Sequence, residues 1–89
     1  MRAIVTVIGR DRVGIIAEVC AILAEQGVNV LDISQTVMQG YFTMMMAVDT
    51  SKSEIPFAEL AKKLDAKGEE MGMSIRLQRE DIFEAMHRV

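Results

Sequence analysis

Two small groups of charged and polar side chains lie near the amino terminus. Asp11 and Arg12 come shortly before Gly14, and Asn29 and Asp32 follow further along the chain. A guanidinium group can hold a carboxylate through paired hydrogen bonds, and a carboxylate can accept an ammonium group. The missing side chain of Gly14 also leaves room for an anion at the first amides of a helix. These residue types suit an amino acid as a ligand, with Arg12 on its carboxylate and Asp11 or Asp32 on its ammonium. The alternative at this point is a solvated turn with an internal ion pair.

The residues between the two groups are expected to form an amphipathic helix. Ile16, Val19, Cys20 and Leu23 recur at i, i+3, i+4 and i+7, which is the spacing of one helical face. Gly27 can take the left-handed conformation that ends a helix. A helix of about 13 residues holds the two groups roughly 20 Å apart. One small ligand can therefore touch both groups only across two subunits.

The composition bounds the class of protein. The 89 residues, 51% of them hydrophobic and 26% charged, are enough for one domain with a modest core. The net charge of -3 disfavours binding to nucleic acid or to an anionic membrane surface. No apolar stretch approaches the ~20 residues that span a bilayer, and no signal-peptide pattern begins the chain. With a single cysteine and hence no internal disulfide, we expect a cytoplasmic protein.

The periodicity of apolar residues predicts four strands and two helices in one domain over residues 1–89. Besides the helix already described, an apolar stripe indicates a second helix from about Pro56 to Gly72. β-Branched or alternating residues indicate strands over residues 3–8, 29–38, 41–48 and 73–78. These elements give a core of about residues 2–79, followed by a short tail over residues 80–89. Three apolar residues of the tail are expected to dock on the core, namely Ile82, Phe83 and Met86.

A tight turn at residues 39–40 is expected to set the register of the second and third strands. If the turn is a two-residue loop, Val37 faces Phe42 and Ile33 faces Met46. This register places the apolar residues of both strands on the same side of the sheet. One face of the second strand is therefore predicted to join the core.

The predicted order is strand-helix-strand-strand-helix-strand, with a helical tail. Right-handed crossovers place both helices on one face of a four-stranded antiparallel sheet, which is the α+β, ferredoxin-like βαββαβ arrangement. The opposite face is left open, and an apolar face of this kind favours self-association through the face, an outer strand edge or the tail. By alternation the open face carries Ile4, Ile8, Tyr41, Met45 and Ala47, mixed with Thr6, Thr43, Ser74 and Arg76.

Two segments of the chain resemble a known family signature. The first runs Asp11-Arg12-Val13-Gly14-Ile15-Ile16-Ala17, and the second runs Leu23-Ala24-Glu25-Gln26-Gly27-Val28-Asn29-Val30-Leu31-Asp32-Ile33. Together they resemble the signature of the ACT-domain family of small-molecule-binding regulatory modules, and the order of elements agrees. The resemblance covers about residues 2–79 and looks like that of small stand-alone ACT proteins. The chain is also similar to the ACT modules of the glycine cleavage system repressor and of formyltetrahydrofolate deformylase.

The resemblance implies where a ligand would bind. In ACT domains, amino acids or related ligands often bind between two domains, one supplying the turn after the first strand and the other the start of the second strand. It also implies a homo-oligomer, expected to be a dimer, or a partner enzyme on which the module acts. Carried over by position, the ligand-binding residues are Asp11, Arg12, Val13, Gly14 and Ile15 in the turn and Asn29, Leu31, Asp32 and Ile33 on the strand.

Few residues support other chemistry. Cys20 lies on the expected buried stripe, where a small hydrophobic role is a better interpretation than a nucleophile. His87 is the only histidine, which excludes a multi-histidine metal site. We see no nucleophile-base pair, phosphate loop or metal cluster, so no catalytic residue, metal or cofactor is expected. The sequence therefore predicts a non-catalytic regulatory module. The open alternatives are a ligand-free oligomerisation module that acts on a partner protein and a small enzyme using Asp11, Arg12 and Asp32.

Overall fold

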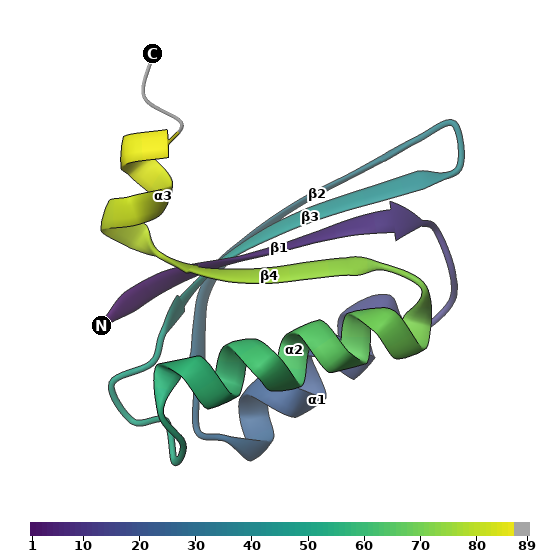
Figure 1. Ribbon diagram of the computed structural model, residues 1–89. Helices are drawn as coiled ribbons and strands as arrows, with labels where there is room; N and C mark the ends of the chain where they lie inside the picture. The colour runs from purple at the N-terminus through teal and green to yellow at the C-terminus, as the bar shows by residue number, and fades with distance from the viewer. Residues whose placement is uncertain (87–89) are drawn as a thin grey trace.

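The chain alternates strands and helices in the predicted order. The computed structural model describes residues 1–86 (Figure 1), so the prediction about His87 lies outside the described residues. The elements are β1 (Arg2–Arg10), α1 (Ile15–Glu25), β2 (Asn29–Met38), β3 (Tyr41–Asp49), α2 (Phe57–Met71), β4 (Ser74–Arg79) and α3 (Glu80–Met86). Left-handed glycines mark the boundaries of α1, with Gly14 at φ 87° before it and Gly27 at φ 75° after it.

The four strands form one antiparallel sheet in the order β2-β3-β1-β4. Each of the two crossover helices therefore passes over one strand before the chain re-enters the sheet. Figure 1 shows α1 and α2 together on one face of the sheet and α3 on the opposite side. The ferredoxin-like arrangement predicted from the sequence is confirmed.

The core lies between this sheet and the two helices α1 and α2. Alternate residues of each inner strand point into it, as the period of two in a strand requires. Leu60, Leu64 and Gly68 form the buried face of α2. The buried strand residues are Ala3, Val5 and Val7 on β1, Phe42, Met44, Met46 and Val48 on β3, and Ile75 and Leu77 on β4.

α1 buries a slightly different stripe from the predicted one. Ile15, Val19 and Leu23 are buried, whereas Ile16 is 36% exposed and Cys20 is only partly buried against the core. Because Ile15 and Ile16 are adjacent, an apolar stripe can begin at either residue, and the two possible stripes differ by about 100° around the helix. The left-handed turn at Gly14 starts the helix so that Ile15 faces the sheet.

β2 confirms the predicted register but not the predicted burial. Val37 pairs with Phe42 and Ile33 with Met46, and a β-bulge leaves Leu31 without a partner between Val30 and Asp32. β2 is an outer strand, however, and Figure 1 shows the tip of the β2–β3 hairpin projecting away from α1 and α2. The expectation that one face of β2 joins the core is therefore wrong for most of the strand, and only Val30 packs partly buried against the core. Four large apolar residues of β2 remain exposed, namely Leu31 at 47%, Ile33 at 42%, Val37 at 53% and Met38 at 67%.

The tail forms the short helix α3 directly after β4. Phe83 is partly buried, but Ile82 and Met86 are 46% and 62% exposed, and no residue of α3 is fully buried. The predicted docking of three tail residues is therefore correct only for Phe83. An ion pair between Arg2 Nε and Glu80 Oε2, at 3.0 Å, joins the start of α3 to β1.

Candidate functional site

The turn between β1 and α1 forms the first half of the predicted site. The backbone amide of Asp11 donates to the carbonyl of Gly40 at 2.8 Å, which fastens the turn to the tip of the β2–β3 hairpin. Asp11, Arg12 and Val13 are exposed, and the Val13 side chain is 96% exposed. Ile15 differs from these residues because its side chain is buried in the core, so it can offer a ligand only its backbone.

Gly14 occupies the cap position of α1 without a side-chain hydrogen bond to the first helical amides. Its carbonyl accepts the amide of Glu18 at 2.9 Å, which is the first hydrogen bond of the helix. The amides of the first turn ordinarily need a partner from outside the helix. This turn can therefore accept an anion, as the sequence suggested.

Arg12 takes part in a chain of charges that joins the two core helices. Its Nη2 lies 3.5 Å from Glu18 Oε2, and Glu18 Oε1 lies 3.6 Å from Lys67 Nζ on α2. Lys67 also lies 3.4 Å from Glu70. The Glu18 Oε2 atom is buried and has no hydrogen-bond partner among the described residues. The internal ion pair considered from the sequence is thus present, with Glu18 as the partner of Arg12.

Sequence reasoning missed the role of Glu18. Arg12 stands just before α1 and Glu18 lies in its first turn, so their closeness was a local signal that could have been found. Lys67 belongs to α2, and only the packing of the two helices brings it to Glu18. No spacing along the chain indicates this contact.

The start of β2 forms the second half of the predicted site. Asn29 is exposed, pairs with Asp49 and lines a hollow of about 300 Å³ together with Gly27, Ser51 and Lys52. Gly27 is needed here, since a Cβ on it would lie 2.8 Å from the carbonyl oxygen of Lys52.

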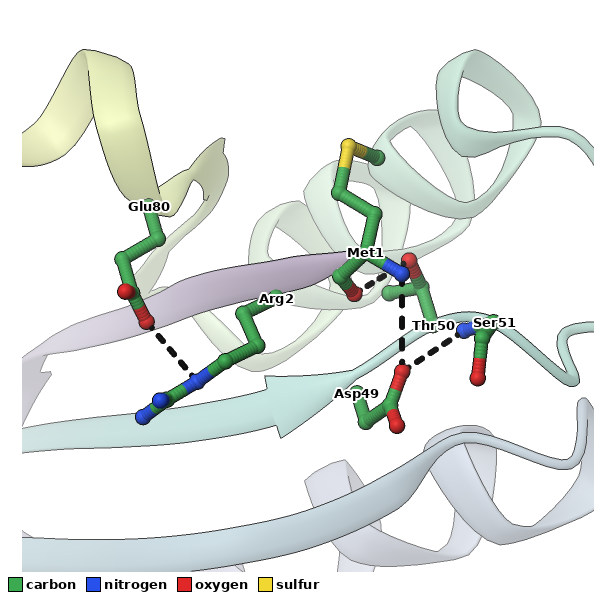
Figure 2. A network of polar contacts seen from close by, with 6 residues as sticks. All are labelled: Met1, Arg2, Asp49, Thr50, Ser51 and Glu80. Carbon is green, nitrogen blue, oxygen red and sulfur yellow. Dashed lines mark hydrogen bonds and ion pairs between the residues drawn. The ribbon is translucent and has the colours of Figure 1, made fainter.

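Asp49 anchors the amino terminus beside this hollow. Figure 2 shows its Oδ1 between the α-ammonium of Met1, at 3.5 Å, and the amide of Ser51, at 2.9 Å. Thr50 completes the network, because its amide and hydroxyl both donate to the carbonyl of Met1. Hydrogen bonds from Ser51 lower the pKa of Asp49 below its ordinary value, and the nearby amino terminus adds to this shift.

The bulge at Leu31 determines on which face of the sheet the following site residues, Asp32 and Ile33, lie. Asp32 pairs with Ala47 and therefore lies on the open face of the sheet, where its Oδ1 accepts the amide of Ile33 at 2.9 Å. Asp32 and Ile33 line a shallow hollow of about 190 Å³ with Ile4, Ser34, Met45, Met46 and Ala47. Leu31, the unpaired residue, is exposed at the strand edge.

The two halves lie at opposite ends of the sheet within one chain. The pairing places Arg10 beside Tyr41 and Met38 at one end, and Arg2 beside Asp49 and Asn29 at the other. β1 has nine residues and thus separates the two ends by roughly 26 Å. The structure therefore keeps the turn residues next to one another, but Asn29 and Asp32 line separate hollows. It does not bring the turn and strand groups together within one chain.

Residues 1–86 contain neither a cluster of metal-ligating side chains nor a helix that could cross a membrane. Within this range, no three or more histidine, cysteine, aspartate or glutamate side chains gather where they could hold a metal ion. Nor does any helix in the same range have the length and apolar character needed to cross a membrane.

Comparison with known proteins identifies the family. Residues 2–78 match the family model of the ACT domain. The chain belongs to the ACT-domain family. It is 56% identical to a UPF0237 protein of Clostridium acetobutylicum over 89 residues, which is the full length of both.

Two solved structures resemble the chain as well. An ACT domain protein from Streptococcus pneumoniae has a TM-score of 0.81 and 44% identity, covering 98% of each chain. The regulatory subunit of aspartate kinase from Thermus thermophilus, in a ligand free form, has a TM-score of 0.66 and 29% identity. That match covers 86% of this ACT chain and 50% of the subunit. The chain is thus a small ACT protein of stand-alone length that shares its fold with a regulatory subunit.

Proposed function

We propose that this ACT protein is a non-catalytic regulatory module that binds an amino acid or a related small metabolite between two copies of the chain. Membership of a family of regulatory modules supports the class of function. The position of the predicted residues supports the interface, since the turn and the start of β2 lie at opposite ends of one sheet. A ligand that touches both must therefore lie between two molecules.

The outer edge of β2 carries this proposal. A strand of ten residues with four large apolar side chains exposed is an unpaired edge that favours pairing with another strand. If two copies pair antiparallel through β2, the Asn29 end of one strand lies beside the Met38 end of the other. The hydrogen bond from Asp11 to Gly40 holds the charged turn near that same end. One two-fold axis then completes two identical sites.

The charges in the two halves suit a zwitterion. Arg12 is 44% exposed and makes a 3.5 Å contact with Glu18, which is long enough for a ligand carboxylate to compete with it. Asn29 and Asp32 offer oxygen acceptors for an ammonium group from the other copy. The first amides of α1, which no side chain of Gly14 caps, add donors for the carboxylate.

A thermal-shift screen against amino acids and folate-pathway metabolites tests the proposal. A ligand at ~100 times its Kd adds ~2.7 kcal/mol of stability. We expect this shift to disappear in both Arg12→Ala and Asn29→Ala. Arg79→Ala is the matched control, because Arg79 is a half-exposed arginine paired with Asp81 outside both halves of the site.

Three results would each count against parts of this function. A shift retained in either the Arg12 or the Asn29 variant would place the ligand elsewhere. No shift with any compound, from a protein that still self-associates, would favour the ligand-free module acting on a partner protein. Turnover of a bound compound would revive the enzyme hypothesis.

We further propose that the module acts on a partner enzyme in the cytoplasm. The free thiol of Cys20, partly buried in α1, is compatible with a reducing compartment. Co-purification from cell extract, compared between wild type and Arg12→Ala with and without ligand, tests the regulatory partner.

A further inference from the structure

A groove separates α3 from the open face of the sheet. Its cavity volume is about 480 Å³, within the roughly 300–1,000 Å³ of small-molecule sites. The sheet supplies the floor and α3 one wall. The lining residues are Thr6, Ile8, Thr43, Met45, Arg76 and Gln78 from the strands and Phe83 and Met86 from α3. None of the nine predicted ligand-binding residues is among them.

Most of the lining is apolar and open to water. Ile8, Met45 and Met86 are 48%, 37% and 62% exposed. Apolar surface gains roughly 25 cal/mol for each Å² that is removed from water. Because the exposed side chains surround one hollow, a single apolar occupant would cover them together. An alkyl chain is the simplest group of suitable shape.

Arg76 places a positive charge in the lining of the groove. It is the only charged residue among the lining residues, so an anionic occupant would supply a counter-charge inside the groove. Arg76 also lines a second hollow, which contains Asp65 and Lys62. The other arginines described in residues 1–86 all have partners. Arg2 pairs with Glu80, Arg12 with Glu18 and Arg79 with Asp81, and Arg10 lies 5.3 Å from the centre of the Tyr41 ring. Within that range, no ion pair is seen for Arg76.

We infer that this groove binds an amphipathic monocarboxylate, with Arg76 holding the carboxylate and the apolar residues holding the alkyl chain. A guanidinium group can donate two parallel hydrogen bonds to a carboxylate, which fixes one end of the ligand. Thr6 pairs with Arg76 across β1 and β4, and Thr6 and Thr43 both supply hydroxyl groups on the floor. The site is separate from the amino-acid site proposed above and takes a different class of ligand.

The groove stays available in the dimer proposed above. Pairing through β2 uses the strand edge, whereas the groove lies over the face of the sheet at β1 and β4. α3 also makes this part of the face concave, which suits a small ligand better than a second flat sheet.

The ligand would also stabilise α3. A helix of seven residues is marginal by itself, and no residue of α3 is fully buried. Gln78 already donates to the sulfur of Met86 at 3.5 Å, which is a weak polar contact between α3 and the sheet. An alkyl chain against Phe83 and Met86 would bury more of the apolar surface of α3. Hydrogen exchange in α3 should therefore slow when the ligand binds.

Isothermal titration calorimetry with octanoate and octan-1-ol tests this inference, since the two probes share a chain and differ in charge. We expect octanoate to bind at least tenfold more tightly than the alcohol to the wild type. Arg76→Gln should reduce octanoate binding to the level of the alcohol. Arg79→Gln, on the same strand but outside the groove, should leave both affinities unchanged. Met45→Ser should weaken both probes equally by removing apolar contact.

Several results would overturn it. A failure of octanoate to bind saturably refutes a carboxylate site, and so does octanoate binding no tighter than that of octan-1-ol. An equal loss in the Arg76 and Arg79 variants would show only general attraction to charge. Unchanged hydrogen exchange in α3 on octanoate binding would place the ligand outside the groove. The amino-acid screen with Arg12→Ala and Asn29→Ala is independent of all four results.

Discussion

Gly68 in α2 provides a test in which two physical effects have opposite signs. It lies inside a 15-residue helix, where replacing glycine by alanine ordinarily adds about 1 kcal/mol of stability. Here a Cβ would lie 2.7 Å from the carbonyl oxygen of Met73 and 3.2 Å from both the amide nitrogen and the Cγ1 of Ile75. Two of these atoms belong to the backbone at the start of β4, which cannot rotate away.

We expect the steric effect to dominate in Gly68→Ala. Overpacking a core costs about 1–3 kcal/mol, and a backbone neighbour favours the upper end of that range. The amide of Met73 also donates to the carbonyl of Gly68 at 2.7 Å, so moving β4 away weakens that hydrogen bond. A cost of about 3 kcal/mol less a gain of about 1 kcal/mol leaves a net destabilisation of about 2 kcal/mol. For a domain of this size, the melting temperature should fall by about 8–16 °C.

Urea denaturation measures this change in the free energy of unfolding. The protein concentration is kept fixed, because self-association makes the apparent free energy of unfolding depend on concentration. Asp65→Ala is the control, because Asp65 is exposed on the same helix and alanine should raise stability there by a few tenths of a kcal/mol. A Gly68→Ala protein as stable as the wild type, or more stable, would refute the claim that β4 backbone limits this position.

Three further changes test other parts of the molecule. Glu18→Gln should increase the affinity for a carboxylate ligand, because it releases Arg12 from its ion pair, and it should cost less than about 1 kcal/mol of stability. A thermal-shift titration that shows weaker ligand binding would contradict this. Ile33→Lys should reduce the molecular mass measured by light scattering to that of a monomer without unfolding the protein, because Ile33 is 42% exposed on the outer strand. An unchanged mass would exclude the β2 edge as the site of self-association. The pKa of Asp49 in the folded protein is lower than its ordinary value of 3.8. The ionised Asp49 side chain therefore stabilises the fold fully at a pH above 3.8, and this stabilisation is lost as the pH falls through the pKa of the folded protein. Urea midpoints of Asp49→Asn should therefore depend less on pH in this acid range than those of the wild type, and parallel curves would argue against the lowered pKa.

The hairpin shows which features of the fold can be predicted from the sequence. A two-residue turn and strict alternation fix the pairing of Val37 with Phe42, since any other register would move apolar residues to the wrong face. The same logic cannot predict burial, which depends on where the helices lie. Ile33 has the correct partner and still remains exposed at the edge. The bulge at Leu31 was missed because one extra residue in a strand leaves little trace in a short apolar run.

The candidate site was predictable only in its local parts. Gly27 has the left-handed conformation that its place after a helix suggested, and Gly14 has a left-handed conformation that was not predicted. The partners of Arg12 depend partly on α2, and the hollow at Asn29 depends on the loop after β3, so neither follows from local spacing. The ligand-binding roles of the nine residues remain predictions, and Arg12→Ala and Asn29→Ala test two of them.

The two edges of the sheet differ in a way that limits assembly. In a dimer joined through β2, both outer edges are β4, a strand of only six residues. α3 follows β4 at the next residue, and the Arg2–Glu80 ion pair holds its first turn against β1. A short strand that ends in a helix is a poor template for adding another strand. In such a dimer, growth of the sheet would therefore stop after one addition, which would leave a closed pair of molecules and protect the protein from fibre formation.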